Sequence, residues 1–416
     1  MTALTLLAVL ATSLGQSDWP QWLGADRENR SKDTGLLQSW PEGGPKRAWR
    51  TDGLGESFGA VSVVGGRIYL LGDLDECYLF ALDEKEGKVL WKSKVGPGHI
   101  HSNKGWQGPR TTPTIDGDRI YVMSEAGDLV CFETASGKEV WRKNMKTDLQ
   151  GDPSPWNYCD SPIIDGKQVV VKPGGSKGAV AGLDKASGEV LWRSVGFTDK
   201  AEHTSMLPVT IEGVKQYIAF TMESVAGIGT DGKVLWKAER KGDVAICTTP
   251  LYKDGIVLVG SSYNTGRATA FKVTKSGDAF KAEKLYDVDF ANHHGGMIIV
   301  GDYVYGTGDL KQGKDRGNAE LKCMELKTGK IVWSNPSIGK GSITFADGNL
   351  IVHSEKPKEG LIALVEATPD GYKEKGRFEQ PDHGGKPAWP HPVVANGRLY
   401  LRDGDVLLCY DVKRAR

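Results

Sequence analysis

The chain has 416 residues, and its 53 lysines and arginines balance 53 aspartates and glutamates. A chain without net charge lacks the basic excess that binds polyanions, so we exclude nucleic acid as a partner. Glycine occurs 54 times, well above its usual share of about 7%. It clusters in DG, GG and TG pairs that are typical of tight turns between short strands. The composition therefore favours an all-β protein.

The first element in chain order is an apolar run from Ala3 to Leu14. This run is too short to cross a bilayer as a helix, but it has the length of the hydrophobic region of a signal peptide. We predict that residues 1–15 are a signal peptide cleaved after Gly15, which would make the protein periplasmic or secreted. Because no lysine or arginine precedes the run, a disordered apolar leader is the alternative.

The rest of the chain repeats one phrase, which reads ETASGKEVWRKN at residues 133–144. Its tryptophan returns at Trp49, Trp91, Trp141, Trp192, Trp236 and Trp333, and Tyr286 takes its place in one copy. The steps between the first five tryptophans are 42, 50, 51 and 44 residues. Within one period, four short runs rich in Val, Ile and Tyr alternate with glycine turns. This pattern predicts one four-stranded antiparallel propeller blade per period.

The two ends of the repeat complement each other. The C-terminal segment HPVVANGRLYLRDGDVLLCYDV supplies three strands, whereas PKRAWR around Trp49 supplies a fourth strand with no blade before it. Pairing these strands in one blade closes the ring, so that no blade at either end of the repeat has an unpaired edge strand. We therefore predict an eight-bladed β-propeller over residues 46–416, preceded by an N-terminal extension over residues 16–45.

The spacing of glycine, lysine and tryptophan in the phrase resembles the tryptophan-docking repeat of the pyrroloquinoline quinone (PQQ) propellers, over nearly the whole chain after the leader. The resemblance implies the same propeller fold. That family includes PQQ-dependent alcohol and glucose dehydrogenases and also non-catalytic relatives, among them the propeller lipoprotein of the outer-membrane β-barrel assembly machine. The fold therefore does not choose between catalysis and binding.

We interpret the repeated tryptophans as structural. The glycine of each phrase accepts a positive φ, and the indole is large enough to fill the gap between wedge-shaped blades while its N–H finds a backbone partner. Cys131, Cys323 and Cys409 fall on third strands, where other blades carry Ala81 or Gly182. A position restricted to small residues is crowded, so we predict that these cysteines are buried in the core.

Candidate functional residues gather in the loops that enter the innermost strands and surround the central channel. Aligning the blades places one residue of each at an equivalent position, namely Phe58, Arg110, Cys159, Ser205, Cys247, His294, Gly341 and Trp389. We predict that these residues ring the channel. Seven of the eight histidines also lie in entering loops. The candidate ligand-binding residues are His99, His101, Trp106, Arg110, Trp156, His203, His293, His294, Trp389 and His391.

Imidazoles, an arginine and indoles at one mouth suit a planar anionic ligand; the alternative is that they only pack the loops between blades. Neutral imidazole also ligates zinc, copper or iron. However, neighbours in an extended segment point in opposite directions, and histidines of separate blades must cross the channel to meet. We therefore predict no metal site.

The resemblance implies a cofactor only if the residues that bind the cofactor in the family are present in this chain. PQQ dehydrogenases of the alcohol type hold PQQ beneath two adjacent disulfide-linked cysteines and bind calcium through Glu, Asn and Asp. This chain has no adjacent cysteine pair and no matching carboxylate and asparagine cluster. The sugar-dehydrogenase type uses a catalytic histidine, but no motif selects one here. We therefore assign no cofactor and no catalytic residue.

Three hypotheses follow from the sequence. The first is an exported, non-catalytic binding or assembly scaffold, whose partner is a protein or a small anionic or glycan ligand bound at the loop face. The second is a PQQ- and calcium-dependent oxidoreductase acting on alcohols or sugars. The third is a glycan-binding propeller that uses Trp106, Trp156 and Trp389 as stacking platforms.

Overall fold

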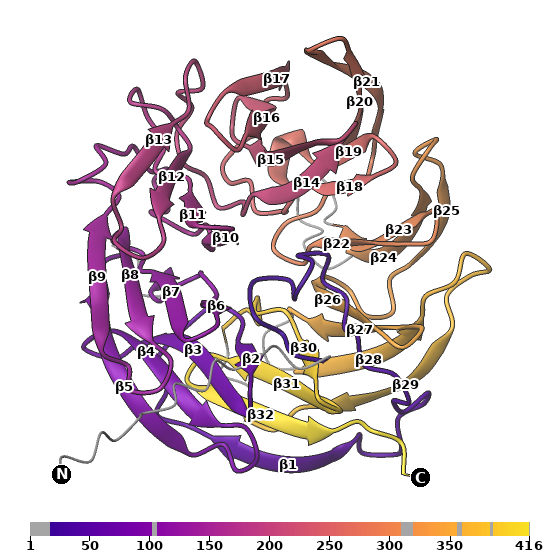
Figure 1. Ribbon diagram of the computed structural model, residues 1–416. Coiled ribbons are helices and arrows are strands. Elements are labelled where there is room, and N and C mark those ends of the chain that lie inside the picture. Colours follow the sequence, from indigo (N-terminus) through magenta and orange to yellow (C-terminus); the bar gives the residue numbers. More distant parts are fainter. Residues whose placement is uncertain (1–16, 102–105, 309–318, 356–359, 383–385, 416) are drawn as a thin grey trace, which may run out of the picture.

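Eight four-stranded antiparallel sheets follow one another around a central axis (Figure 1). The computed structural model describes residues 17–101, 106–308, 319–355, 360–382 and 386–415, so the predicted signal peptide lies outside the described residues. The predicted all-β, eight-bladed propeller is confirmed. Within the described ranges, no helix has the length and apolarity needed to cross a membrane.

Each of the first seven blades is a meander of four consecutive strands. Blades 1 to 4 consist of β2 (Ser62–Val64), β3 (Arg67–Asp73), β4 (Glu76–Asp83) and β5 (Val89–Pro97); β6 (Thr114–Asp116), β7 (Arg119–Met123), β8 (Asp128–Glu133) and β9 (Glu139–Asn144); β10 (Ile163–Asp165), β11 (Gln168–Val171), β12 (Ala181–Asp184) and β13 (Val190–Arg193); and β14 (Leu207–Ile211), β15 (Val214–Phe220), β16 (Ser224–Gly229) and β17 (Val234–Glu239).

Blades 5 to 7 repeat the same order of strands. They consist of β18 (Leu251–Lys253), β19 (Ile256–Ser261), β20 (Arg267–Ser276) and β21 (Ala279–Val288), with the short 3-10 helix η2 (Tyr263–Thr265) between β19 and β20; β22 (Met297–Val300), β23 (Tyr303–Gly308), β24 (Glu320–Glu325) and β25 (Ile331–Asn335); and β26 (Gly341–Ala346), β27 (Asn349–Ser354), β28 (Leu361–Glu366) and β29 (Glu374–Glu379).

The eighth blade joins the two ends of the chain. β30 (Val393–Ala395), β31 (Arg398–Asp403) and β32 (Val406–Asp411) are completed by β1 (Lys46–Thr51), which pairs antiparallel with β32 and places Trp49 opposite Cys409. In Figure 1 the indigo strand β1 accordingly lies outside the yellow strand β32. This pairing closes the ring as the sequence predicts.

The glycine and the tryptophan of the repeated phrase meet across the boundary between neighbouring blades. Gly188 of blade 3 has φ +75°, and an added Cβ would lie 2.7 Å from Cε3 of Trp141 in blade 2. Gly137 of blade 2 packs against Trp91 of blade 1 in the same way, with a corresponding distance of 2.5 Å. The turn glycine is therefore needed both for its backbone conformation and for the space that the indole occupies.

Three of the indole N–H groups donate to a carbonyl oxygen of the next blade. Trp49 donates to Glu84 O at 3.1 Å, Trp141 to Lys185 O at 3.0 Å, and Trp333 to Thr368 O at 2.9 Å. Trp192 and Trp236 differ from this expectation, because they donate to the side-chain oxygens of Gln168 and Gln216 in their own blades. The N–H of Trp91 is buried without a hydrogen-bond partner among the described residues.

The six cysteines are all free, and only Cys247 is not fully buried. Cys131 and Cys323 have no exposed surface and pair in register with Trp141 and Trp333. At the equivalent position of blade 3, a Cβ on Gly182 would come within 2.3 Å of Trp192. The tryptophan on the fourth strand thus restricts the third strand to small side chains.

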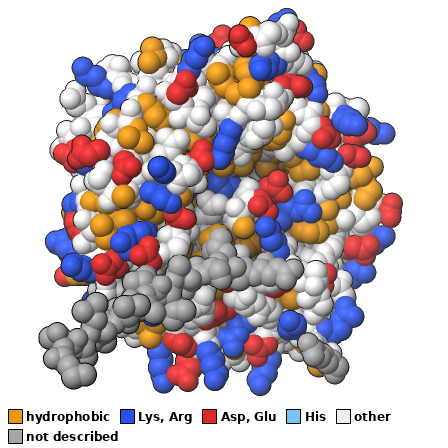
Figure 2. Space-filling model, viewed as in Figure 1, with side chains coloured by type: hydrophobic (Ala, Val, Ile, Leu, Met, Phe, Trp, Pro, Cys, Tyr) orange, Lys and Arg blue, Asp and Glu red, His pale blue; other side chains and the backbone are white. Residues whose placement is uncertain are grey.

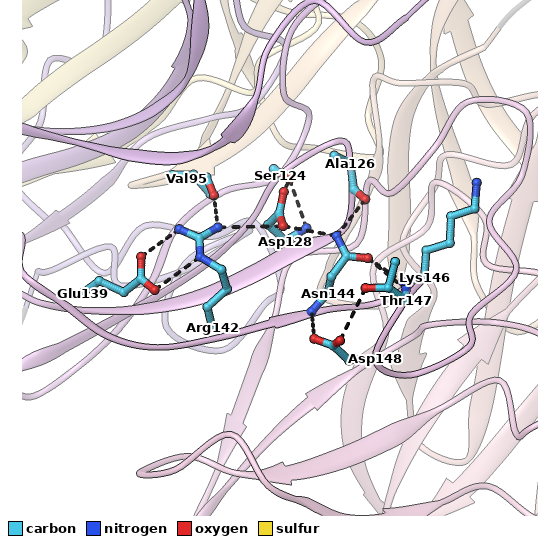
Figure 3. Close-up of polar contacts among 10 residues, drawn as sticks. All are labelled: Val95, Ser124, Ala126, Asp128, Glu139, Arg142, Asn144, Lys146, Thr147 and Asp148. Atoms are coloured by element: carbon cyan, nitrogen blue, oxygen red, sulfur yellow. Dashed lines mark hydrogen bonds and ion pairs between the residues drawn. The ribbon is translucent and has the colours of Figure 1, made fainter.

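Charged side chains lie mainly on the outside, where Figure 2 shows basic and acidic groups interspersed over the visible face. Figure 3 shows one such group of contacts between the first two blades. Arg142 of β9 donates to the carbonyl of Val95 in β5 and pairs with Glu139 at 2.7 Å. Asn144 donates to Asp128 at 3.1 Å and accepts the backbone N–H groups of the following turn. The bond from Arg142 to Val95 joins the outer strands of adjacent blades, and the other contacts fix the outer strand and the following turn of blade 2.

The segment before β1 crosses the middle of the ring (Figure 1), a role that the sequence did not predict for residues 16–45. Trp19 pairs with Val63 of blade 1, and Arg30 pairs with Phe345 near the end of β26 in blade 7. Between them, Trp22 donates to Thr249 of blade 5 at 3.0 Å. Five further contacts are made by side chains of this segment with other blades: Arg27 to Ser161 O and Pro162 O, and Asn29 to Ile343 O, Thr344 Oγ1 and His391 Nδ1. We call residues 17–30 the plug segment, because it occupies the central channel.

Candidate functional site

The entering loops enclose a small cavity on the channel axis. Its lining residues are Trp22, Phe58, Arg110, Cys159, Ser161, His203, Ser205, Cys247, His294 and Trp389. Seven of the eight residues that blade alignment places at the equivalent position are therefore present, and the missing one, Gly341, begins β26. Trp22 comes from the plug segment and closes the cavity from within the channel. The cavity volume is about 50 Å³, which is room for an ion or a few water molecules.

A continuous aromatic stack fills the loop side of the cavity. Trp389 is only 9% exposed. It lies between Trp106, at 4.9 Å between ring centroids and 4° between planes, and His294, at 3.8 Å and 20°. Phe58 approaches the same indole at 4.7 Å. Because both faces of Trp389 already contact rings, it offers no free face to a planar ligand.

Two further aromatic candidates, His101 and Trp156, also contact each other and so are not free to stack on a ligand. The imidazole of His101 stacks on Trp156 at 5.4 Å with 11° between planes, and Trp156 donates to Val244 O at 3.3 Å. His99 stands apart from the cavity, since its side chain is 45% exposed and lies 4.0 Å from the carboxylate of Asp73.

The arginine at the mouth is neutralised by a buried acid that sequence reasoning missed. Arg110 forms an ion pair with Glu125, and their side chains are 6% and 5% exposed. Arg110 also donates to Trp106 O and Gly108 O. Burial raises the pKa of Glu125, while the adjacent guanidinium opposes that rise. The positive charge predicted to hold an anion is thus already paired within the protein.

Two adjacent histidines converge here, although neighbours in an extended segment would point in opposite directions. The rings of His293 and His294 lie 3.9 Å apart, with 64° between their planes. The two residues are not in an extended strand, because the chain turns at Gly295 and Gly296 before β22, and Gly296 has φ +72°. The turn lets neighbouring side chains point to the same side.

The remaining imidazoles are buried around this pair. Nδ1 of His391 accepts a hydrogen bond from the side-chain amide of Asn29 at 2.9 Å. Nε2 of His391 donates to the backbone oxygen of His294, also at 2.9 Å. Burial lowers the pKa of His203 to about 3 and that of His391 to about 4, and it lowers the pKa values of His293 and His294 well below the usual value. The site therefore presents neutral imidazoles at neutral pH.

Three buried charged residues stand behind the cavity wall. Lys172 has no exposed surface and donates to both oxygens of Thr204. Asp160 and Glu202 are 1% and 4% exposed. Burial raises the pKa of Glu202 to about 7, although Lys172 opposes the rise. Charged residues are expected at the surface, so the sequence gives no signal for this group.

These residues do not fit PQQ. Planar cofactors of that size occupy pockets of about 300–1,000 Å³, whereas this cavity measures about 50 Å³ and its loop side is filled by the stack on Trp389. The arginine is paired with Glu125. None of the described residues that line the cavity carries a carboxylate for calcium. We therefore derive no catalytic step through PQQ.

The sequence relatives include assembly factors and enzymes, among the latter a polyvinylalcohol dehydrogenase and a tetrathionate hydrolase. The outer membrane protein assembly factor BamB of Shewanella oneidensis is 23% identical over 278 residues, which are 64% of this chain and 65% of that protein. The polyvinylalcohol dehydrogenase of a Sphingopyxis species is 23% identical over 292 residues, 61% of this chain and 42% of the enzyme. The matches to BamB and to the polyvinylalcohol dehydrogenase thus span less than two thirds of those relatives' own lengths.

Solved structures show the same fold at low identity. BamB from Moraxella catarrhalis superposes with a TM-score of 0.63 at 13% identity, covering 89% of this chain and 98% of that one. The quinohemoprotein alcohol dehydrogenase from Comamonas testosteroni gives 0.61 at 14% identity, covering 96% and 81%. The family model described as outer membrane protein assembly factor BamB matches residues 75–335, more than half of the chain. The chain therefore belongs to this family of PQQ-like repeat propellers.

Proposed function

We propose that the protein is an exported, non-catalytic scaffold that acts in the periplasm and binds a protein partner through the loop face of the propeller. The observation that carries this proposal is the small volume of the cavity at the loop mouth of the channel, about 50 Å³. The space in which a cofactor or substrate would react is narrowed by the stack on Trp389 and by Trp22 of the plug segment. Family membership supports the same proposal, because the BamB relatives are named as assembly factors.

The loop face has the properties of a binding surface. The ring presents a rigid frame of eight sheets, and loops on a rigid frame are the usual place for recognition. The mixed charges on the surface (Figure 2) favour a protein over a polyanion. An apolar side chain, Val244, is 42% exposed in the loop that enters β18. A glycan ligand has less support, since Trp106, Trp156 and Trp389 all stack on other rings.

The proposal predicts that a partner is reached from the loop face alone. A photo-crosslinking amino acid is placed in the native host at exposed Lys241 or exposed Asn264, and in a control at exposed Lys167 in the opposite turn between β10 and β11. We expect both loop-face positions to crosslink the same protein, identified by mass spectrometry, and Lys167 to give no such product. Equal crosslinking from all three positions would contradict a loop-face partner.

The oxidoreductase alternative makes a different prediction. Purified protein mixed with PQQ and Ca²⁺ should bind no stoichiometric PQQ by absorption spectroscopy and should reduce no dye with alcohols or aldoses, because the cavity is too small and lacks carboxylates. A dehydrogenase reconstituted in parallel provides the positive control. Stoichiometric binding with turnover would refute the scaffold proposal.

A further inference from the structure

Three donor side chains of the types that bind transition metals meet beside the cavity. Ligand atoms of Cys247, His293 and His294 all lie within 4.8 Å of one another. Cys247 precedes β18 of blade 5, whereas the two histidines precede β22 of blade 6. The Cys247 sulfur lies 3.8 Å from Nε2 of His294. The donors therefore come together across a blade boundary, and one ion placed between them would reach all three.

The hydrogen bonding of this group is incomplete. His293 is only 6% exposed, and its Nε2 is buried without a hydrogen-bond partner among the described residues. Buried polar atoms are normally paired, and an exception calls for an explanation such as an ion. The 3.8 Å contact of Cys247 is long for its thiol. The Nε2 atom of His293 and the sulfur of Cys247 are thus both available to bind an ion.

We propose that Cys247, His293 and His294 form a three-coordinate site for a soft monovalent metal ion, Cu(I). Thiolate is a soft ligand that selects copper(I), and imidazole suits copper as well. One thiolate and two neutral imidazoles carry a single negative charge, which Cu(I) cancels. A divalent ion would leave a net positive charge in a buried site next to Lys340, and burying such a charge is unfavourable.

Lys340 provides a specific test of this geometry. Its ammonium lies 3.0 Å from Nδ1 of His293 and 3.0 Å from the carboxylate of Glu355. An ammonium only donates, so it holds the proton of neutral His293 on Nε2. A histidine that binds metal through one nitrogen usually donates its other N–H to an acceptor. Lys340 therefore competes with the metal, and its existing ion pair with Glu355 can keep the ammonium paired when the metal binds.

The experiment measures Cu(I) affinity directly on the purified full chain. The protein is titrated anaerobically, under reducing conditions, against a chromogenic Cu(I) chelator. We expect one Cu(I) per chain. Cys247→Ser should weaken binding by at least about 100-fold, more than the 10–100-fold typical of an outer-shell change. The control, Cys159→Ser, removes the other thiol that lines the same cavity and should bind as the parent does.

Lys340→Gln should bind Cu(I) about tenfold more tightly, because an amide oxygen can accept the Nδ1 proton of His293. Circular dichroism confirms that each variant is folded. Absence of stoichiometric Cu(I) binding, an equal loss in Cys247→Ser and Cys159→Ser, or weaker binding by folded Lys340→Gln would overturn the proposal. Tighter binding of Zn²⁺ than of Cu(I) in a parallel titration would overturn the assignment of the metal.

Discussion

Replacing Trp141 with alanine is expected to lower the free energy of unfolding by about 3–5 kcal/mol, the usual cost of removing a buried aromatic side chain. Trp141 is 9% exposed and belongs to the hydrophobic cluster between blades 2 and 3. Its ring covers Gly188 of the next blade, and its N–H donates to Lys185 O at 3.0 Å. The substitution removes packing and a hydrogen bond at one boundary of the ring.

Val140 gives the matched control, because it precedes Trp141 on the same strand and is 40% exposed. Val140→Ala should change the unfolding free energy by no more than about 0.5 kcal/mol, as is usual for surface substitutions. Urea denaturation followed by far-UV circular dichroism measures both variants without relying on tryptophan fluorescence. Equal midpoints for Trp141→Ala and the parent would refute the structural role of the repeated tryptophans.

The second large effect concerns pH. Glu202→Gln is expected to stabilise the protein at pH 8 by up to about 3 kcal/mol, the free energy that corresponds to the difference between a pKa of about 7 in the fold and 4.5 in the unfolded chain. Burial causes this rise, and Lys172 opposes it only in part. Because the folded-state pKa is raised, the protonated acid is favoured by folding. Its contribution is complete below about pH 4.5, declines as the pH rises towards 7, and is lost above that value.

The neutral glutamine imitates the protonated acid at every pH, so parent and variant should be nearly equal at pH 4.5 and differ most at pH 8. Thermal and urea unfolding across this range measure the difference. Glu239→Gln is the control, since the Glu239 side chain is 78% exposed. Its unfolding free energy should differ from that of the parent by the same small amount at every pH. A variant less stable than the parent at pH 8 would show that Glu202 is needed as a charged partner of Lys172.

The fold was predictable because its determinants are local and repeated. Each period contains its own turn glycines, alternating apolar strands and tryptophan, so the register of one blade can be read from the next. The same repetition located the channel, since equivalent positions in equivalent blades must lie on one circle. That reasoning places Arg110, Cys247 and His294, among others, around the channel, and these residues line the cavity.

The state of the channel was not predictable, because it depends on contacts outside the repeat. Trp22 reaches Thr249 and Arg27 reaches Ser161, over sequence separations of 227 and 134 residues. No periodicity encodes such contacts, so the sequence pattern predicts only an N-terminal extension for residues 16–45 and gives it no role. The ion pair of Arg110 with Glu125 was missed because charge pairing depends on side-chain positions and burial, which a sequence pattern does not contain.

By itself, the sequence determined the eight-bladed ring, its closure by β1 and the circle of residues that faces the axis. Only the tertiary structure decided what that circle encloses. Packing of the plug segment and the stack on Trp389 leave a cavity of only about 50 Å³ at the loop mouth, and the turn at Gly295 and Gly296 brings His293 and His294 together. The physical reason is that strand and turn patterns act over a few residues, whereas the shape and charge of a cavity result from side chains that meet only after the ring closes.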